Sequence, residues 1–380
     1  MRSSWIEIDL DALRKNTEFI MNRLAPGTRL MAPVKGNAYG HGAPRVAKLF
    51  RDAGATSFGV AIPEEGVELR EAGIQEPILI FGYTFDDSYD LLFDYDLIPN
   101  VFTMEQAEQL NELAGKKGKR LTIHVSIDIG LHRLGMDLDE NTAGKVKAIA
   151  QMPNLYLEGL FSMFSTGYSY PDTDYCHEQF RSFMDLCGKL ETMGVKIPLK
   201  HICDSGATLL FPEMHLDIVR PGTFLYGTDC GAVHTYFPEV VIHPAMTVKS
   251  RLACVRKIEA GACVGYDRSW QAQRPGVIGV VPCGYVDGTS RIASNRGFVL
   301  LHGKRCPIIA NICMDQMMID ITEVDDPKVG DEIVLVGTQN GETISLGEAG
   351  EFGCTTDTEY ICRQNKRLPI FYLENGKIVD

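Results

Sequence analysis

The sequence predicts an α/β fold in which a (β/α)8 barrel of the TIM type is followed by a mostly β C-terminal domain. Two observations lead to this prediction. The first two thirds of the 380-residue chain alternate short apolar runs with amphipathic segments, which is typical of parallel strands joined by helices. The last third is rich in strand-like runs separated by Gly and Asp turns, which favours an antiparallel arrangement.

Eight apolar runs define the predicted barrel strands. Because eight strands within roughly 200 residues suit a closed barrel, we prefer it to a doubly wound sheet, which is the alternative. Helical patterns at residues 63–72, 104–114 and 177–192 lie between the runs. The predicted strands cover residues 30–34, 57–61, 78–81, 97–101, 121–127, 155–161, 200–202 and 216–219.

Near residues 229–244 the alternation of strand and helix patterns gives way to a strand-rich pattern. This change places the barrel at residues 10–230 and the β domain at residues 231–380. Residues 5–10 alternate apolar and acidic side chains, so we expect a strand within residues 1–9 that pairs with the second domain. The strands expected in that domain cover residues 246–257, 277–281, 298–301, 306–310, 317–321 and 332–336.

Bulk composition excludes several function classes. The net charge is −13, and no long run of Lys and Arg marks a nucleic-acid or membrane surface. The 11 cysteines form no C-x-x-C pair, so neither a zinc site nor a disulfide framework is indicated, and we expect no metal. No segment resembles a signal peptide or a membrane span. These features predict a cytoplasmic protein with reduced thiols.

The segment 31–42 carries the strongest chemical signal. An apolar run delivers Lys35 into a turn rich in Gly and Asn, and Tyr39 follows where one helical turn would place it on the side of the lysine. Burial lowers the pKa of such a lysine and makes its amine nucleophilic, as a Schiff-base lysine for pyridoxal phosphate (PLP) requires. An exposed lysine at a strand end is the alternative interpretation.

Two further groups of residues are candidates for a site. Arg220 follows the last predicted barrel strand and precedes Gly222 and Thr223, in a loop position where barrels often bind phosphate. Ser205 lies in the preceding loop of this kind. A structural arginine is the alternative for Arg220. The segments around Tyr266, around Tyr285 and at 312–316 read, on their own, as β-turns that pack a domain face.

These motifs together resemble the alanine racemase family. Residues 31–42, 133–135, 220–227, 264–266, 284–288 and 312–316 occur in the family's order, and the match spans essentially the whole chain. The resemblance implies a PLP-binding barrel with a C-terminal β domain. It also implies a small amino-acid substrate and a head-to-tail homodimer whose sites borrow residues from the partner subunit.

The resemblance assigns roles to individual residues. Lys35 would hold PLP and serve as one base, and Tyr266 from the partner subunit would be the opposing base. Racemisation needs a base on each face of the planar α-carbon, so two bases are chemically sensible. The implied cofactor-binding residues are Lys35, Tyr39, Ser205, Arg220 (at the pyridine nitrogen), Gly222, Thr223 and Thr358; the implied substrate-binding residues are Arg133, Met314, Tyr285 and Asp315.

Four positions depart from the family pattern. Met163 stands where an imidazole is usual, and Asp204 where an asparagine is usual. Ser126 replaces a lysine that is often carbamylated and braces Arg133. Thr358 replaces a tyrosine, unless Tyr360 fills that place.

The predicted activity is the interconversion of L- and D-alanine, as used in the supply of D-alanine to the cell wall. A pocket altered at these four positions leaves serine or a basic amino acid such as lysine or ornithine as alternative substrates. PLP-dependent decarboxylation is a rival reaction, which Tyr266 and Arg220 disfavour. A PLP-carrying regulatory protein is a non-enzymatic rival, which the second domain disfavours.

Overall fold

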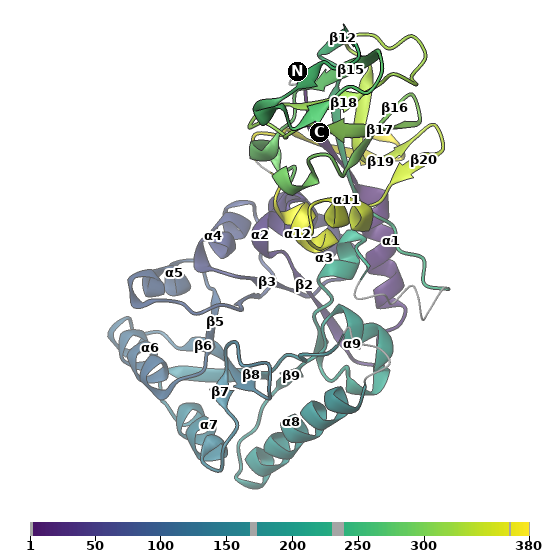
Figure 1. The fold of residues 1–380 in the computed structure, drawn as a ribbon. Helices are drawn as coiled ribbons and strands as arrows, with labels where there is room; N and C mark the ends of the chain where they lie inside the picture. Colours follow the sequence, from purple (N-terminus) through teal and green to yellow (C-terminus); the bar gives the residue numbers. More distant parts are fainter. Residues whose placement is uncertain (1–2, 168–172, 230–238, 365, 380) are drawn as a thin grey trace.

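The computed structural model describes residues 3–167, 173–229, 239–364 and 366–379. Figure 1 shows a barrel built from the first part of the chain and, packed on one side of it, a β-rich unit built from the last part. The predicted boundary at residues 230 and 231 lies outside the described residues, so the domain limits stay a prediction.

Eight parallel strands form a closed barrel. Their order is β5-β4-β3-β2-β10-β9-β8-β6, and pairing between β5 and β6 closes the ring. This confirms the predicted fold class, and each predicted run overlaps one of the strands. The strands are β2 (Arg29–Pro33), β3 (Ser57–Val60), β4 (Ile78–Ile80), β5 (Ile98–Val101), β6 (Leu121–Asp128), β8 (Leu155–Phe161), β9 (Leu199–His201) and β10 (Ile218–Val219), with the short β7 (Met136–Asp137) attached to β6.

Helices follow the barrel strands and cover their outer side (Figure 1). Their starts are set by side-chain caps: Asp9 accepts two backbone N–H groups at the start of α1, and Thr103 accepts one at the start of α6. The larger helices are α1 (Leu10–Met21), α3 (Ala43–Asp52), α4 (Pro63–Glu71), α5 (Tyr89–Asp94), α6 (Met104–Lys116), α7 (Thr142–Ala150), α8 (Asp174–Thr192) and α9 (Ser205–Leu210).

The barrel interior is filled by side chains. Met31, Leu79, Ile98, Phe161 and Ile218 come from five different barrel strands and form a cluster separate from the main core. Burying a side chain of this kind stabilises the fold by about 1.5–3 kcal/mol. The interior of the barrel is therefore a packed core rather than a pore.

The second sheet includes the N-terminal strand. β1 (Trp5–Asp9) pairs antiparallel with β11 (Met246–Arg251) and parallel with β21 (Ile370–Glu374). The remaining strands of this sheet are β12 (Cys254–Ile258), β15 (Gly276–Val281), β16 (Phe298–Leu301), β17 (Lys304–Ile309), β18 (Met317–Asp320), β19 (Glu332–Gln339), β20 (Glu342–Ile344) and β22 (Lys377–Val379).

The single strand predicted at residues 246–257 is two strands. β11 pairs with β1 and β19, whereas β12 pairs with β15. Leu252 and Ala253 lie at the change of partner, where their N–H groups donate to Asp331 and Val280 respectively. The apolar pattern continues across this change, which is why the sequence did not reveal it.

Within the described ranges, the structure has no helix that is both long enough and apolar enough to cross a membrane.

Candidate active site

Lys35 immediately precedes a short left-handed turn that follows the C-terminal end of β2. In α2 (Lys35–Tyr39), φ is 62° at Gly36, 54° at Asn37, 52° at Ala38 and 52° at Tyr39, and Gly40 follows at 83°. The left-handed conformation costs roughly 1–2 kcal/mol for each residue other than glycine. The prediction assumed a right-handed turn, because the positive φ values of Asn37, Ala38 and Tyr39 have no signal in an ordinary helical pattern.

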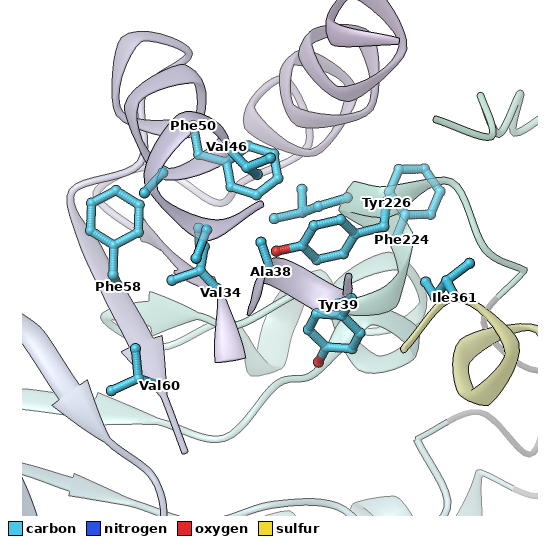
Figure 2. Packing of buried hydrophobic residues seen from close by; sticks show 14 of the residues in the cluster. Val34, Ala38, Tyr39, Val46, Phe50, Phe58, Val60, Phe224, Tyr226 and Ile361 are labelled. Carbon is cyan, nitrogen blue, oxygen red and sulfur yellow. The ribbon is translucent and has the colours of Figure 1, made fainter. Parts of the chain in front are cut away.

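Packing on the inner side helps to hold this turn. Figure 2 shows Ala38 and Tyr39 within the cluster of buried side chains, next to Tyr226. The Tyr39 and Tyr226 rings lie 4.7 Å apart, and the Tyr226 hydroxyl donates to the carbonyl of Pro33. Ile361, from α12 (Asp357–Cys362), lies so close to Gly40 that a Cβ there would meet its carbonyl oxygen at 2.4 Å.

A cleft of about 790 Å³, open to solvent, lies at the carboxyl ends of the barrel strands. Six residues singled out from the sequence line it together: Lys35, Tyr39, Arg133, Arg220, Gly222 and Thr223. Phe81, Asn100, Ser126, Met163 and Asp204 are among the other lining residues.

The Lys35 amine is half-buried in this cleft. Burial lowers its pKa, and the positive charge of Arg133 lowers it further. Cys362 and Glu65 act in the opposite direction, while Arg220 also lowers this pKa. The net lowering increases the fraction of unprotonated amine, the form that attacks a carbonyl and accepts a proton.

Arg220 is held by a buried relay of hydrogen bonds. Its Nη1 lies 3.0 Å from Nδ1 of His201, and Nε2 of that ring lies 3.0 Å from Nδ1 of His124. The far nitrogen of His124 lies 3.1 Å from a carboxylate oxygen of Glu158. Because a guanidinium only donates and a carboxylate only accepts, each ring carries its proton on Nε2, and both imidazoles are neutral.

Electrostatics agree with this assignment. Burial lowers the pKa of His124 and takes that of His201 well below its usual value, and Arg220 disfavours a charge on either ring. Burial also lowers the pKa of Arg220 to about 10, which leaves the guanidinium charged at neutral pH. Its Nη2 donates to the carbonyls of Ser162 and Ile202.

One end of the cleft is suited to a phosphate group. A Cβ at Gly222 would meet the Tyr39 hydroxyl oxygen at 2.7 Å, so only glycine lets the two segments approach this closely. The hydroxyl of Thr223 donates to Ser205 Oγ at 3.3 Å, and the same oxygen accepts the N–H of Phe224. Ser205 is fully buried and reaches the cleft through Thr223 rather than lining it.

Asp204, Ser126 and Met163, three of the positions that depart from the family pattern, line the cleft and differ in their contacts. Asp204 caps α9 by accepting the N–H of Ala207 at 2.9 Å. The Ser126 hydroxyl is buried and has no hydrogen-bond partner among the described residues. Met163 lies beside Arg220, with its sulfur 3.9 Å from Nη2. Arg133, which is exposed, has no hydrogen bond or ion pair from its guanidinium within the described part of the chain.

Thr358 and Tyr360, the two candidates for the position of the family's tyrosine, both lie outside the lining of the cleft. Tyr360 is buried in the β domain, in a small cavity lined by Phe298 and Phe352. Thr358 is partly buried and bonds to Asp357. Neither of the two is among the residues that line the cleft.

Tyr266, Tyr285 and Met314 lie elsewhere. They line a second, shallow pocket on the β domain, whose lining residues include none of those that line the barrel cleft. Their exposed fractions are 69%, 41% and 52%. Asp315, next to this pocket, forms an ion pair with Arg367. The single chain therefore presents two separate groups of candidate residues.

Sequence reasoning missed several residues at the cleft. His201 lies within a predicted barrel strand, and His124 lies within another, but nothing in their spacing indicated that the two rings meet. Glu65 contacts the turn after Lys35 from 29 residues further along the chain. Phe81 directly follows β4, and Asn100 is the next-to-last residue of β5. Their positions at the ends of predicted barrel strands could have indicated that they line the site.

Comparison with known proteins agrees with this arrangement. Residues 8–230 match the model of the alanine racemase N-terminal domain, and residues 245–372 match that of the C-terminal domain. Alanine racemase 1 of Caldanaerobacter subterraneus subsp. tengcongensis is 39% identical over 99% of this chain and 96% of its own length.

Two solved structures extend the comparison. Alanine racemase from Bacillus anthracis with bound L-Ala-P has a TM-score of 0.94 at 30% identity, covering 100% of this chain and 97% of its own. Alanine racemase from Bartonella henselae with covalently bound pyridoxal phosphate has a TM-score of 0.88 at 26% identity, covering 98% and 100%. The resemblance inferred from the motifs is confirmed, and the chain belongs to the alanine racemase family.

Proposed function

We propose that this protein is a PLP-dependent racemase that interconverts L- and D-alanine. The observation that carries the proposal is the barrel cleft itself, which is lined by a half-buried lysine with a lowered pKa, by a buried arginine and by the hydroxyl groups of Tyr39 and Thr223. Full-length similarity to proteins named alanine racemase supports the same reaction.

The residues of the cleft fit PLP. Lys35 supplies the amine for covalent attachment, Arg220 a charged donor for the pyridine nitrogen, and Tyr39 and Thr223 hydroxyl groups for the phosphate. The close approach of Gly222 to Tyr39 leaves room that a Cβ would fill. When bound, PLP withdraws electrons from the substrate and makes the proton on its α-carbon acidic. Thr358, at the start of α12, is the further residue that we assign to the cofactor side.

Two bases perform the proton transfers in this proposal. The Lys35 amine removes or returns a proton on one face of the α-carbon, and the Tyr266 hydroxyl does so on the other. Tyr266 is exposed on the β domain and does not line the barrel cleft of its own chain. We therefore propose a head-to-tail homodimer in which the pocket of one subunit covers the cleft of the other.

Arg220 restricts the reaction to racemisation. It cannot give up its proton to the pyridine nitrogen, because its own pKa of about 10 is far above that of a pyridine. The neutral histidine relay accepts from Arg220 and does not compete for that nitrogen. A neutral pyridine is a weaker electron sink, which limits side reactions such as transamination.

Alanine is the substrate that we propose, with Arg133 binding its carboxylate and Met314, Tyr285 and Asp315 lining the entrance. One carboxylate oxygen of Asp204 caps α9, and a basic amino acid such as lysine or ornithine stays a less favoured alternative substrate. Serine remains the second candidate, because a pocket rarely rejects an added hydroxyl by more than about 100-fold without a dedicated feature.

A racemisation screen tests the proposal. The PLP-loaded protein is incubated with each common L-amino acid in deuterated water. The products are then separated by chiral chromatography. We expect D-alanine to form fastest, with deuterium at the α-carbon. Release of CO₂, or no exchange with any amino acid, would contradict the proposed function.

We also place the protein in the cytoplasm. Five cysteines of the described ranges are buried in the fold, where a thiol serves as a small apolar group, as in proteins kept under reducing conditions.

A further inference from the structure

The left-handed turn of Gly36, Asn37, Ala38, Tyr39 and Gly40 is a strained element that joins two groups of the cleft. Lys35 lies immediately before it and Tyr39 is its fourth residue. Strained backbone of this kind persists only where surrounding contacts over-determine it. The contacts that hold the turn therefore also fix the positions of the amine and the hydroxyl.

At its C-terminal end the turn is held by its own residues. The N–H of Gly40 donates to the carbonyl of Gly36, and the N–H of Gly42 donates to the carbonyl of Asn37. The Asn37 side chain accepts the N–H of Ala43, the first residue of α3. These bonds link the turn to the helix that follows it.

At its N-terminal end the turn is held by Glu65, in the first turn of α4. One carboxylate oxygen accepts the N–H of Gly36 at 2.6 Å, and the other accepts the N–H of Ala61 at 2.7 Å. The side chain thus connects the turn to the end of β3. Both bonds require an acceptor, which a carboxylate offers at each of its two oxygens.

The charge of Glu65 also acts on the neighbouring amine. Its carboxylate and Cys362 raise the pKa of Lys35, whereas burial, Arg133 and Arg220 lower it. Loss of this one negative charge is expected to leave more of the amine unprotonated at a given pH.

We propose that Glu65 is a positioning residue, whose carboxylate clamps Gly36 and Ala61 and so fixes Lys35 and Tyr39 relative to the cleft. The inference rests on the proposed function of the cleft for its consequence in the reaction, but the clamp itself is a property of the protein without cofactor.

The matched pair E65Q and E64Q tests the clamp. Both variants remove one negative charge from the same helix turn, but Glu64 is exposed and is not within the clamp. Glutamine keeps one acceptor oxygen and turns an NH₂ group toward the second N–H, so E65Q loses one of the two bonds.

The first readout is amide hydrogen exchange in the protein without PLP. For E65Q we expect exchange at Gly36 or Ala61 to accelerate by about tenfold, the effect of one lost charged bond, with no change in E64Q. The amide of Val334 in β19 serves as the internal reference for global unfolding. Acceleration of all three amides alike, or of none, would overturn the proposal.

The second readout is the pH dependence of PLP capture by the protein without cofactor. We expect the profile of E65Q to move to lower pH, with weaker PLP binding, and that of E64Q to stay at the wild-type position. An unchanged profile in E65Q would overturn the proposed positioning of Lys35. If instead the clamp responds as expected but no amino acid is racemised, the proposed function fails and the clamp stands.

Discussion

The barrel cleft and the pocket on the β domain differ in how their polar groups are held. In the cleft, Arg220 is 5% exposed and bonded through His201 and His124 to Glu158. On the β domain, Tyr266 is 69% exposed and its hydroxyl forms no hydrogen bond with a described residue of its own chain. The polar groups of the barrel cleft are fixed by contacts within one subunit, whereas the tyrosine of the pocket on the β domain is exposed.

This difference teaches how the reaction can be divided between two subunits. The groups that hold a charged cofactor need a rigid, buried setting, because an unpaired buried charge is costly. The opposing base only has to reach the open side of the cleft. In the homodimer that we propose, the surface tyrosine on the turn at Gly265–Tyr266 supplies this group.

The largest effect is expected for K35A. Removal of the amine eliminates both the covalent attachment of PLP and one base, so kcat/KM should fall by about 10⁴-fold or more. The absorbance of covalently held PLP should disappear as well. The control is K48A, because Lys48 is an exposed lysine of α3. Retention of activity within tenfold in K35A would contradict the role of the cleft.

R133Q should have the next largest effect. A charged hydrogen bond to the substrate carboxylate is worth about 1.5–3 kcal/mol, so KM should rise by roughly tenfold to hundredfold with a smaller change in kcat. Steady-state kinetics with alanine measures both. A fall in kcat alone, at constant KM, would mean that Arg133 does not bind the substrate.

As the pH is lowered, the barrel should lose stability before the β domain does. The buried histidines of the described chain, His41, His124, His201 and His215, lie in the barrel, and burial lowers the pKa of each, to about 4 for His41. Below pH 6.5 the unfolded chain binds protons that the folded barrel does not. The free energy of unfolding therefore falls as the pH drops from 6.5 toward 4. Each histidine that is protonated in the unfolded chain but not in the folded one lowers it by up to about 1.4 kcal/mol per pH unit.

Hydrogen exchange at pH 7 and pH 5 measures this difference. We expect amides of β6 and β9 to lose protection more than those of β19. Equal losses in both regions would contradict the barrel histidines as the acid-sensitive groups.

The smallest effect is expected for T358Y. A ring at this position should narrow the cofactor side of the site and lower the relative rate with serine, by less than about tenfold. The ratio of kcat/KM for L-alanine and L-serine measures it. An unchanged ratio would show that Thr358 does not contribute to substrate preference.

Much of the barrel could be predicted from the sequence because each strand is an apolar run followed by a helical pattern. The position of Lys35 at a strand end and of Arg220 after β10 followed directly from that order. The left-handed turn, the Glu65 clamp and the relay through His124 and His201 could not be predicted. They depend on contacts between residues far apart in the chain, 19 residues at Arg220 and His201 and 77 residues at His124 and His201.

The most direct test of the divided site is a mixed dimer of K35A and Y266F. Each variant alone should be nearly inactive, with Y266F reduced by about 10²–10⁴-fold. In the mixed dimer, one site combines both substitutions and the other has an intact Lys35 and an intact Tyr266. Random mixing should therefore restore about a quarter of the wild-type activity. No recovery, although mixed dimers form, would contradict the account and place both bases within one subunit.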